Sequence, residues 1–270
     1  SRRDTGNPRD NLIMPDSNAA EDDGSVHTID FGATTFTLNG TVGNGTNGNN
    51  KNYIYWAIAK NVPSNTTLAN SFRTVTYTGN SSAAVTVNGL GFAPDLVWAK
   101  SISPVNEHNL YDTLRGAPFK LKSNANSAQE SSGALDSFTS DGFTLRSGGY
   151  SLNQDNNTYV AWCWKAGNTW QSNLDGTIGS IVNANTANGF SIVKFNKTTN
   201  SSTASTFGHG LSAAPEMIIL KRTDGTEDWY VYHTSMGNAA RVQLNSSDAK
   251  TTGTNVWGQT NPSATVFTVE

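Results

Sequence analysis

Five residues of this sequence have side chains and surroundings suited to holding a ligand. Three are aromatic, Trp229, Tyr230 and Trp257, and they stand beside polar stretches, which predicts that the two indole rings are exposed. An exposed aromatic ring presents a flat apolar face on which a sugar ring can stack. The other two, Asp112 and Arg115, are three residues apart and could bracket a glycan or a protein partner. The same pair could instead pin its own loop through a charge-assisted hydrogen bond, and we favour that simpler interpretation.

Residues that make or break covalent bonds are not evident in the sequence. No histidine has a spacing that holds a metal ion, and no Gly-x-Ser-x-Gly nucleophile motif occurs. A glycosidase needs two carboxylates across a cleft, but Asp95 and Glu216 occupy equivalent positions in separate parts of the chain. A calcium site at residues 155–157 lacks the pattern of a dedicated loop. We therefore expect no catalytic residue, no metal and no cofactor. The scattered histidines are His27, His108, His209 and His233.

Four further tryptophans, Trp56, Trp98, Trp162 and Trp164, allow two interpretations. They could line a sugar-binding face, or they could fill the interior of the fold. Trp56 matches Trp162 in a repeated stretch, and Ile58 stands in that stretch where the other copy has Trp164. Because an aliphatic residue replaces an indole in the same slot, the pattern favours a packed core.

Composition restricts the class of protein. Only 14% of the residues are charged, and the net charge is −3 with the basic residues dispersed, so we expect no nucleic-acid partner. No apolar run approaches the roughly 20 residues that span a bilayer, so we expect no membrane insertion. Cys163 is the single cysteine, which excludes an intrachain disulfide. Asn, Ser, Thr and Gly are abundant and favour turns and strand surfaces over helices, which predicts an all-β protein.

A repeated unit must position these side chains. The stretch Gly89–Lys100 returns as Gly210–Lys221, 121 residues later, and each copy runs from a Gly-rich turn through Ala-Pro and an acid to four apolar residues and Lys. That pattern predicts a turn that leads into a buried strand. A second repeat relates Tyr53–Ile58 to Tyr159–Trp164.

Matching the copies divides the chain. We also compare Ser17–Glu21 with Ser123–Ser127, which would make the start of the chain the later half of a unit. The predicted organisation is the C-terminal half of a first β-sandwich repeat at 1–60, a linker at 61–70, a complete central repeat at 71–166, a linker at 167–188, and most of a third repeat at 189–270. The period is that of a sandwich domain, so the expected fold is all-β with tandem antiparallel β-sandwich units of the jelly-roll, concanavalin-like type, the first and last incomplete.

The motifs of the central unit resemble a known family. They read Gly-Phe-x-Pro-Asp-Leu-Val-Trp-x-Lys, Tyr-Asp-Thr-x-Arg-Gly, Ser-Phe-x-Ser-Asp-Gly-Phe-Thr-Leu and Tyr-Val-Ala-Trp-Cys-Trp-Lys-Ala-Gly, ending at residues 100, 116, 145 and 167. This order is similar to that of a repeated, uncharacterised domain in virion structural proteins of marine tailed phages, often labelled tail fibre or tail proteins. The resemblance is strongest in the central unit. It implies a lectin-like jelly roll, a location on an extracellular phage particle, and no particular ligand.

The expected function is therefore that of a virion structural protein, a tail fibre, spike or decoration, that serves assembly and host-surface attachment. Its partners would be other virion proteins, copies of itself, with a trimer favoured by analogy with tail fibres, and a host surface glycan. The alternative is a carbohydrate-binding module or adhesin of a marine bacterium. A polysaccharide-degrading enzyme is the least favoured class, because no paired acids are found.

Overall fold

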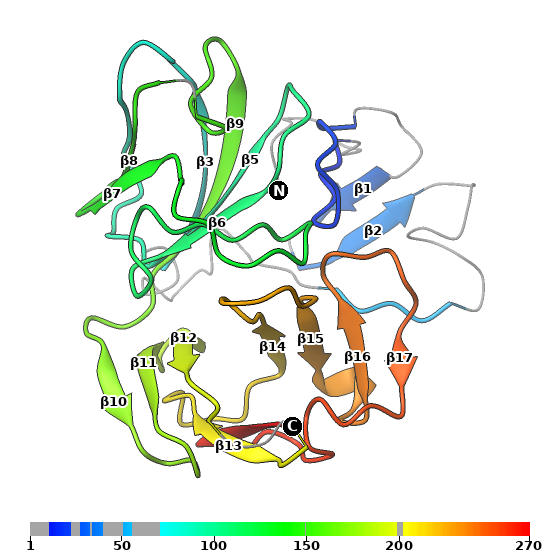
Figure 1. Cartoon of the computed structure of the whole chain (residues 1–270). Helices are drawn as coiled ribbons and strands as arrows, with labels where there is room; N and C mark the ends of the chain where they lie inside the picture. The colour runs from blue at the N-terminus through cyan, green and yellow to red at the C-terminus, as the bar shows by residue number, and fades with distance from the viewer. Residues whose placement is uncertain are drawn as a thin grey trace.

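The chain folds into antiparallel sheets without an α-helix in the part that is described. The computed structural model describes residues 11–22, 28–32, 34–39, 51–55, 71–148, 150–198 and 202–270 (Figure 1). In these ranges the only helical element is a single 3-10 turn, η1 (Thr234–Met236). No helix among the described residues is long and apolar enough to cross a membrane. The predicted all-β class with tandem β-sandwich units is confirmed.

The central unit is a sandwich of two sheets. One sheet has the order β3-β9-β5-β6 and the other has the order β4-β8-β7. Their inward side chains form one core, in which Val97 and Cys163 of the first sheet and Phe143 of the second are all fully buried. The strands are β3 (Phe72–Thr78), β4 (Val85–Val87), β5 (Leu96–Ser101), β6 (Asn109–Asp112), β7 (Leu135–Thr139), β8 (Gly142–Leu145) and β9 (Thr158–Trp164).

The third unit has a thinner core. It contains three sheets, ordered β10-β11-β12, β13-β18 and β14-β15-β16-β17. Phe207 and Phe267 of the small sheet are buried against partly buried side chains from β12 and β14. The strands are β10 (Gln171–Asn173), β11 (Ser180–Asn185), β12 (Phe190–Phe195), β13 (Ser205–Gly208), β14 (Met217–Leu220), β15 (Tyr230–His233), β16 (Ala240–Gln243), β17 (Thr251–Thr252) and β18 (Val266–Val269).

The strand pairings of the two units correspond residue for residue. Val97 faces Tyr111 in the β5–β6 ladder, and Ile218 faces Tyr232 in the β14–β15 ladder, 121 residues later on both strands. Val87 likewise faces Phe143, and Phe207 faces Phe267. The Gly-rich turn is also preserved, because Ser212 adopts a left-handed φ of 61° where Gly91 has 79°. The two units therefore share a framework.

Two expectations need correction. The linker expected at 167–188 contains β10 and β11, which pair in one sheet with β12. The expected match of Ser17 with Ser123 is displaced by two residues, because the bridge Leu12–Asp22 corresponds to the bridge Lys120–Glu130, an offset of 108.

The start of the chain contributes one short hairpin, β1 (Thr28–Phe31) with β2 (Phe36–Asn39). Trp56 and the rest of residues 56–70, which include the expected linker at 61–70, lie outside the described residues.

Candidate functional site

The most distinctive arrangement in the molecule is a junction between units that occurs twice. At the first junction, residues 11–22 lie along the central unit. Glu21 N donates to Ile102 O at 3.0 Å, and Asn106 N donates to Asn18 O at 2.9 Å. The Nε2 of His108 lies 2.9 Å from Met14 O. Because a carbonyl oxygen only accepts, this ring nitrogen carries the proton.

At the second junction, residues 120–130 of the central unit lie along the third unit in the same way. Gln129 N donates to Thr223 O at 2.8 Å, and Glu227 N donates to Asn126 O at 3.0 Å. The Nε1 of Trp229 donates to Lys122 O at 2.8 Å.

The two sets of hydrogen bonds correspond one to one. Advancing the first segment by 108 residues and the central unit by 121 converts each of these three bonds of the first junction into a bond of the second. His108 and Trp229 therefore occupy equivalent positions. Each donates a ring N–H to an equivalent backbone carbonyl, Met14 O or Lys122 O. Two different residues meeting one geometric requirement indicate that the junction itself is the preserved feature.

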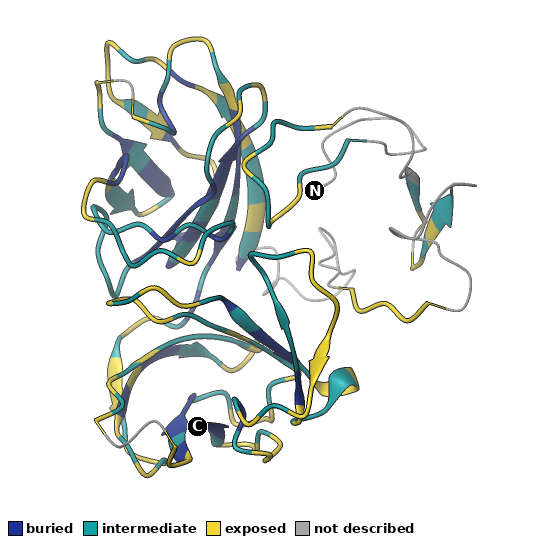
Figure 2. Cartoon of the chain, turned by 45° about the vertical axis from the view of Figure 1, so that its right-hand side comes forward, coloured by how far each residue is buried: buried dark blue, intermediate teal, exposed yellow. Residues whose placement is uncertain are grey.

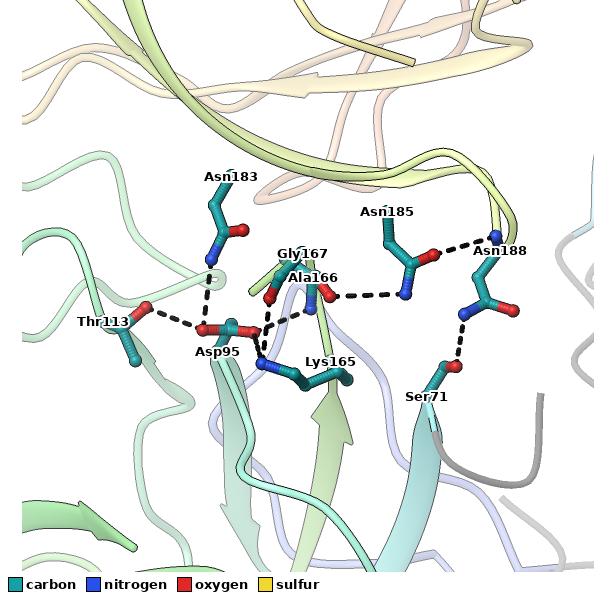
Figure 3. Close-up of polar contacts among 9 residues, drawn as sticks. All are labelled: Ser71, Asp95, Thr113, Lys165, Ala166, Gly167, Asn183, Asn185 and Asn188. Carbon is teal, nitrogen blue, oxygen red and sulfur yellow. Dashed lines mark hydrogen bonds and ion pairs between the residues drawn. The ribbon is translucent and has the colours of Figure 1, made fainter. Parts of the chain in front are cut away.

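A buried polar cluster reinforces the second junction from the side of β5 (Figure 3). The carboxylate of Asp95, only 7% exposed, accepts from Lys165 Nζ at 3.0 Å and from the backbone N of Ala166 at 2.9 Å. Its other oxygen accepts from Thr113 Oγ1 at 3.1 Å and from Asn183 Nδ2 of β11 at 3.3 Å. Charge-assisted bonds of this kind are about twice as strong as neutral ones, and the one from Asn183 ties β11 to the central sheet.

Two further asparagines extend the same line of contacts. Asn185 Nδ2 donates to Ala166 O at 3.3 Å, and Asn188 Nδ2 donates to Ser71 Oγ (Figure 3). Beside them, the rings of Trp164 and Phe190 stack with their centroids 6.2 Å apart. The junction is thus polar along one edge and aromatic along the other.

The structure does not gather the five candidate ligand-binding residues on one exposed surface. Trp229 and Trp257 are 5% and 2% exposed, so the prediction that their rings are exposed was wrong. The reason is that Trp229 is covered by the Lys122–Ala125 loop, which is remote in sequence, and Trp257 donates through Nε1 to Ala240 O at 3.1 Å. Tyr230 is half-buried, and the guanidinium of Arg241 lies 4.3 Å from its ring centroid.

Asp112 and Arg115 form the loop pin that the sequence favoured. Asp112 accepts from the backbone N of Arg115 at 2.8 Å and from its Nε at 2.5 Å. The same guanidinium donates to Leu110 O at 3.1 Å and lies 3.3 Å from Gln129 Oε1. These contacts fix the segment that forms the second junction, so the pair positions backbone there.

Of the tryptophans interpreted as core, Trp164 is buried, while Trp98 and Trp162 are half-buried and pack edge to face with centroids 6.1 Å apart. Trp98 also donates from Nε1 to His108 Nδ1 at 2.8 Å. This side of the central sheet therefore supports the first junction through its aromatic rings.

Two ionisable groups near the first junction are deeply buried. Burial, with a smaller contribution from the nearby Lys100 ammonium, lowers the pKa of His108 to about 4, and the hydrogen bond to Met14 O opposes that shift. Burial likewise lowers the pKa of Lys100 to about 8, and the Glu107 carboxylate opposes that shift. Lys100 is fully buried and donates to Ser101 O at 2.9 Å. The side chains of His108 and Lys100 are both enclosed by packed neighbours, as expected for residues that stabilise a contact.

An open hollow of about 390 Å³ adjoins the first junction. Its walls combine polar and apolar surface and come from the N-terminal segment and the edge of the central sheet. They are Asn11, Glu21, Thr76, Tyr77, Thr78, Ile102 and Thr158. Across the described ranges, no group of three or more His, Cys, Asp or Glu side chains is arranged to hold a metal ion.

Comparison with known proteins gives one match. A family described as Domain of unknown function (DUF7483) matches residues 67–270. The chain belongs to this family. The matched DUF7483 region covers the central and third units, the second junction and all five candidate residues. No curated protein and no solved structure matches the chain.

Proposed function

We propose that this DUF7483 protein is a structural component of a tailed-phage virion, part of a tail fibre, spike or decoration. Its task is to extend a chain of sandwich units in a fixed orientation, and its partners are other virion proteins. The role is mechanical and not catalytic.

The observation that carries this proposal is the repetition of the junction. A flexible linker would leave successive units free to turn, whereas here each unit hydrogen-bonds the next through the same backbone atoms. Burial of Asp95, Trp229 and Trp164 at the contact gives it the character of a domain interior. A protein that must transmit position or force along a particle needs such unit-to-unit contacts.

The resemblance of the central motifs to marine phage virion proteins supports the same role and adds host-surface attachment to it. The decisive test is immunogold labelling of intact virions whose genome encodes this chain. Antibody bound along tail fibres, spikes or the particle surface is the expected result. A chain that is missing from purified particles overturns the proposal.

The proposal also includes a homo-oligomer, with a trimer favoured. Size-exclusion chromatography with light scattering should give three times the 28.8 kDa mass of the chain. A monomer at every concentration would contradict the proposed trimer and would leave the proposed virion role unaffected.

A carbohydrate-binding module or adhesin is the second candidate, because residues that can hydrogen-bond a sugar, among them Asn11 and Thr76, line the hollow at the first junction. Thr76→Trp or Thr158→Trp would fill that hollow. Calorimetric titration with host polysaccharide that shows binding by the native chain, abolished by these changes, would favour this class.

A further inference from the structure

The two junctions differ in one chemical respect, which is the ring that donates a hydrogen bond to the docked segment. The first junction uses the imidazole of His108, and the second uses the indole of Trp229. An imidazole can bind a second proton between pH 5 and pH 8, whereas the indole nitrogen is a donor only. The equivalent contact is therefore titratable in the first junction and not in the second.

Both nitrogens of the His108 ring already have partners. Nε2 donates to Met14 O at 2.9 Å, and Nδ1 accepts from Trp98 Nε1 at 2.8 Å. A second proton would have to bind at Nδ1, where it would face the N–H of Trp98 and turn an attractive contact into a repulsive one. The ring is 1% exposed, so water cannot replace the lost partner while the ring stays in place. Because the ring is held between two fixed partners, a movement away from Trp98 also breaks the bond to Met14.

The charged side chains that lie near the ring come from β5 and from the loop before β6. Lys100 of β5 is fully buried, and its ammonium group disfavours a second positive charge on His108. The pKa of Lys100 is about 8, so this residue is charged across the whole acidic range. The carboxylate of Glu107 acts on Lys100 and accepts a hydrogen bond from Asn124 Nδ2. Residues 11–22 present backbone carbonyl groups to the ring. A protonated ring would therefore meet a cation and an N–H donor on the side of the central sheet.

The segment that His108 holds is attached at the surface of the central unit. Every residue from 11 to 22 is intermediate or exposed. Figure 2 shows that buried residues are concentrated in the strands of the central unit. The members of the central core cluster all lie between residues 75 and 163. Since a segment with few buried contacts opens at a much lower free energy than the whole domain, residues 11–22 can detach while the sandwich stays folded.

We infer that the first junction is an acid-released contact, in which protonation of His108 detaches residues 11–22 from the central unit while the second junction stays closed. The docked state binds the proton less tightly than the released state, so a fall in pH favours release. The pKa of His108 is about 4 in the docked state and its ordinary value is 6.5, so release develops as the pH falls through this interval. The inference concerns one contact of this chain and stands independently of the virion role.

The test is hydrogen exchange of the full chain at pH 7 and pH 5, with rates corrected for the intrinsic effect of pH. The amides of Glu21 and Asn106 report on the first junction, and those of Gln129 and Glu227 report on the second. Protection of the first pair should fall by up to about twentyfold, the limit for a pKa that returns from about 4 to 6.5, and protection of the second pair should not change. Protection of the first pair that is the same at both pH values, or an equal loss at both junctions, overturns the inference.

Two variants assign the effect to the ring. His108→Gln retains an N–H donor for Met14 O but cannot be protonated, so its first junction should not respond to pH. Trp98→Phe removes the N–H that opposes a proton on Nδ1, so this variant should lose less protection at pH 5 than the native chain. The NMR titration of the His108 ring should show a higher pKa in Trp98→Phe than in the native chain.

The choice of pH 5 excludes most other groups. Ordinary carboxylates have pKa values near about 4 and stay mostly ionised at pH 5, so histidine is the side chain that titrates across the interval. A loss of protection in His108→Gln as large as in the native chain would assign the release to another group and contradict the inference. That outcome would leave the virion role unaffected, because the role depends on the hydrogen bonds of both junctions at neutral pH.

Discussion

The central and third units use the same ladders but reach different degrees of burial. In the central unit the β9 strand closes the sheet, and the core side chains of both sheets are removed from water. In the third unit the β5–β6 and β4–β8 pairings recur as β14–β15 and β13–β18, yet the partly buried residues outnumber the buried ones in the core cluster. The comparison teaches that strand register and depth of burial are separable properties, since the same ladders recur while the side chains that they carry are buried to different degrees.

The largest expected effect compares two equivalent phenylalanines. Phe143→Ala should lower the free energy of unfolding of the central unit by about 3–5 kcal/mol, since it leaves a cavity in a closed core. Phe267→Ala, at the equivalent position, should cost less, because an open core relaxes around the deletion. Urea denaturation followed by hydrogen exchange can assign each loss to its unit. Equal losses would show that the third core is closed in solution.

A second effect concerns acid. His108 is neutral in the folded protein with its pKa lowered from 6.5 to about 4, so between these values the unfolded chain binds a proton that the folded one does not. Stability of the central unit should therefore fall as pH drops from about 6.5 to about 4, by about 3 kcal/mol in total.

The measurement is the urea midpoint of the central unit across that pH range. His108→Gln should flatten the profile, and His209→Gln in the third unit should leave the profile of the central unit unchanged. A steep profile that survives in His108→Gln would assign the acid sensitivity to other groups.

A third effect concerns the polar cluster around Asp95 at the second junction. Asp95→Asn should destabilise the contact between the units by about 1.5–3 kcal/mol, the range for a hydrogen bond to a charged group. Glu216→Gln is the matched control, because Glu216 is the equivalent acid of the third unit and is exposed; a surface change of this kind stays within about 0.5 kcal/mol. Limited proteolysis between the units and small-angle scattering report the loosening, and similar effects of both changes would contradict the role of Asp95.

The smallest effect separates two buried indoles. Trp229→Phe removes a donor to Lys122 O and should cost about 1 kcal/mol at the second junction. Trp257→Phe removes a donor to Ala240 O and should cost a similar amount inside the third unit alone. Hydrogen exchange at Gln129 and Glu227 should therefore accelerate only in Trp229→Phe. Acceleration in both variants would mean that the junction and the third unit open together.

Much of the fold follows from local sequence. The apolar run at Leu96–Ala99 and its repeat at Met217–Leu220 predict β5 and β14, and alternation predicts β3 and β12. β11 was missed because it contains asparagine at two of six positions, and asparagine is depleted in strands. Pairing with β12 overrides that preference.

The candidate site was less predictable. Polar neighbours suggested that Trp229 is exposed, but the loop that covers it lies about a hundred residues earlier in the chain. The junction had a signal, the repeat of Gly89–Lys100, but the sequence does not say that Asp95 turns toward Asn183 while Glu216 faces solvent. Such contacts depend on how the units dock.

The doubled junction has a geometric consequence. When one body is joined to its like by an unchanging rotation and shift, every further addition repeats that same screw operation. A long array of these sandwiches would therefore wind about a single axis with a constant pitch. The hydrogen bonds accepted by Asn18 O and Asn126 O would recur at every step along that axis.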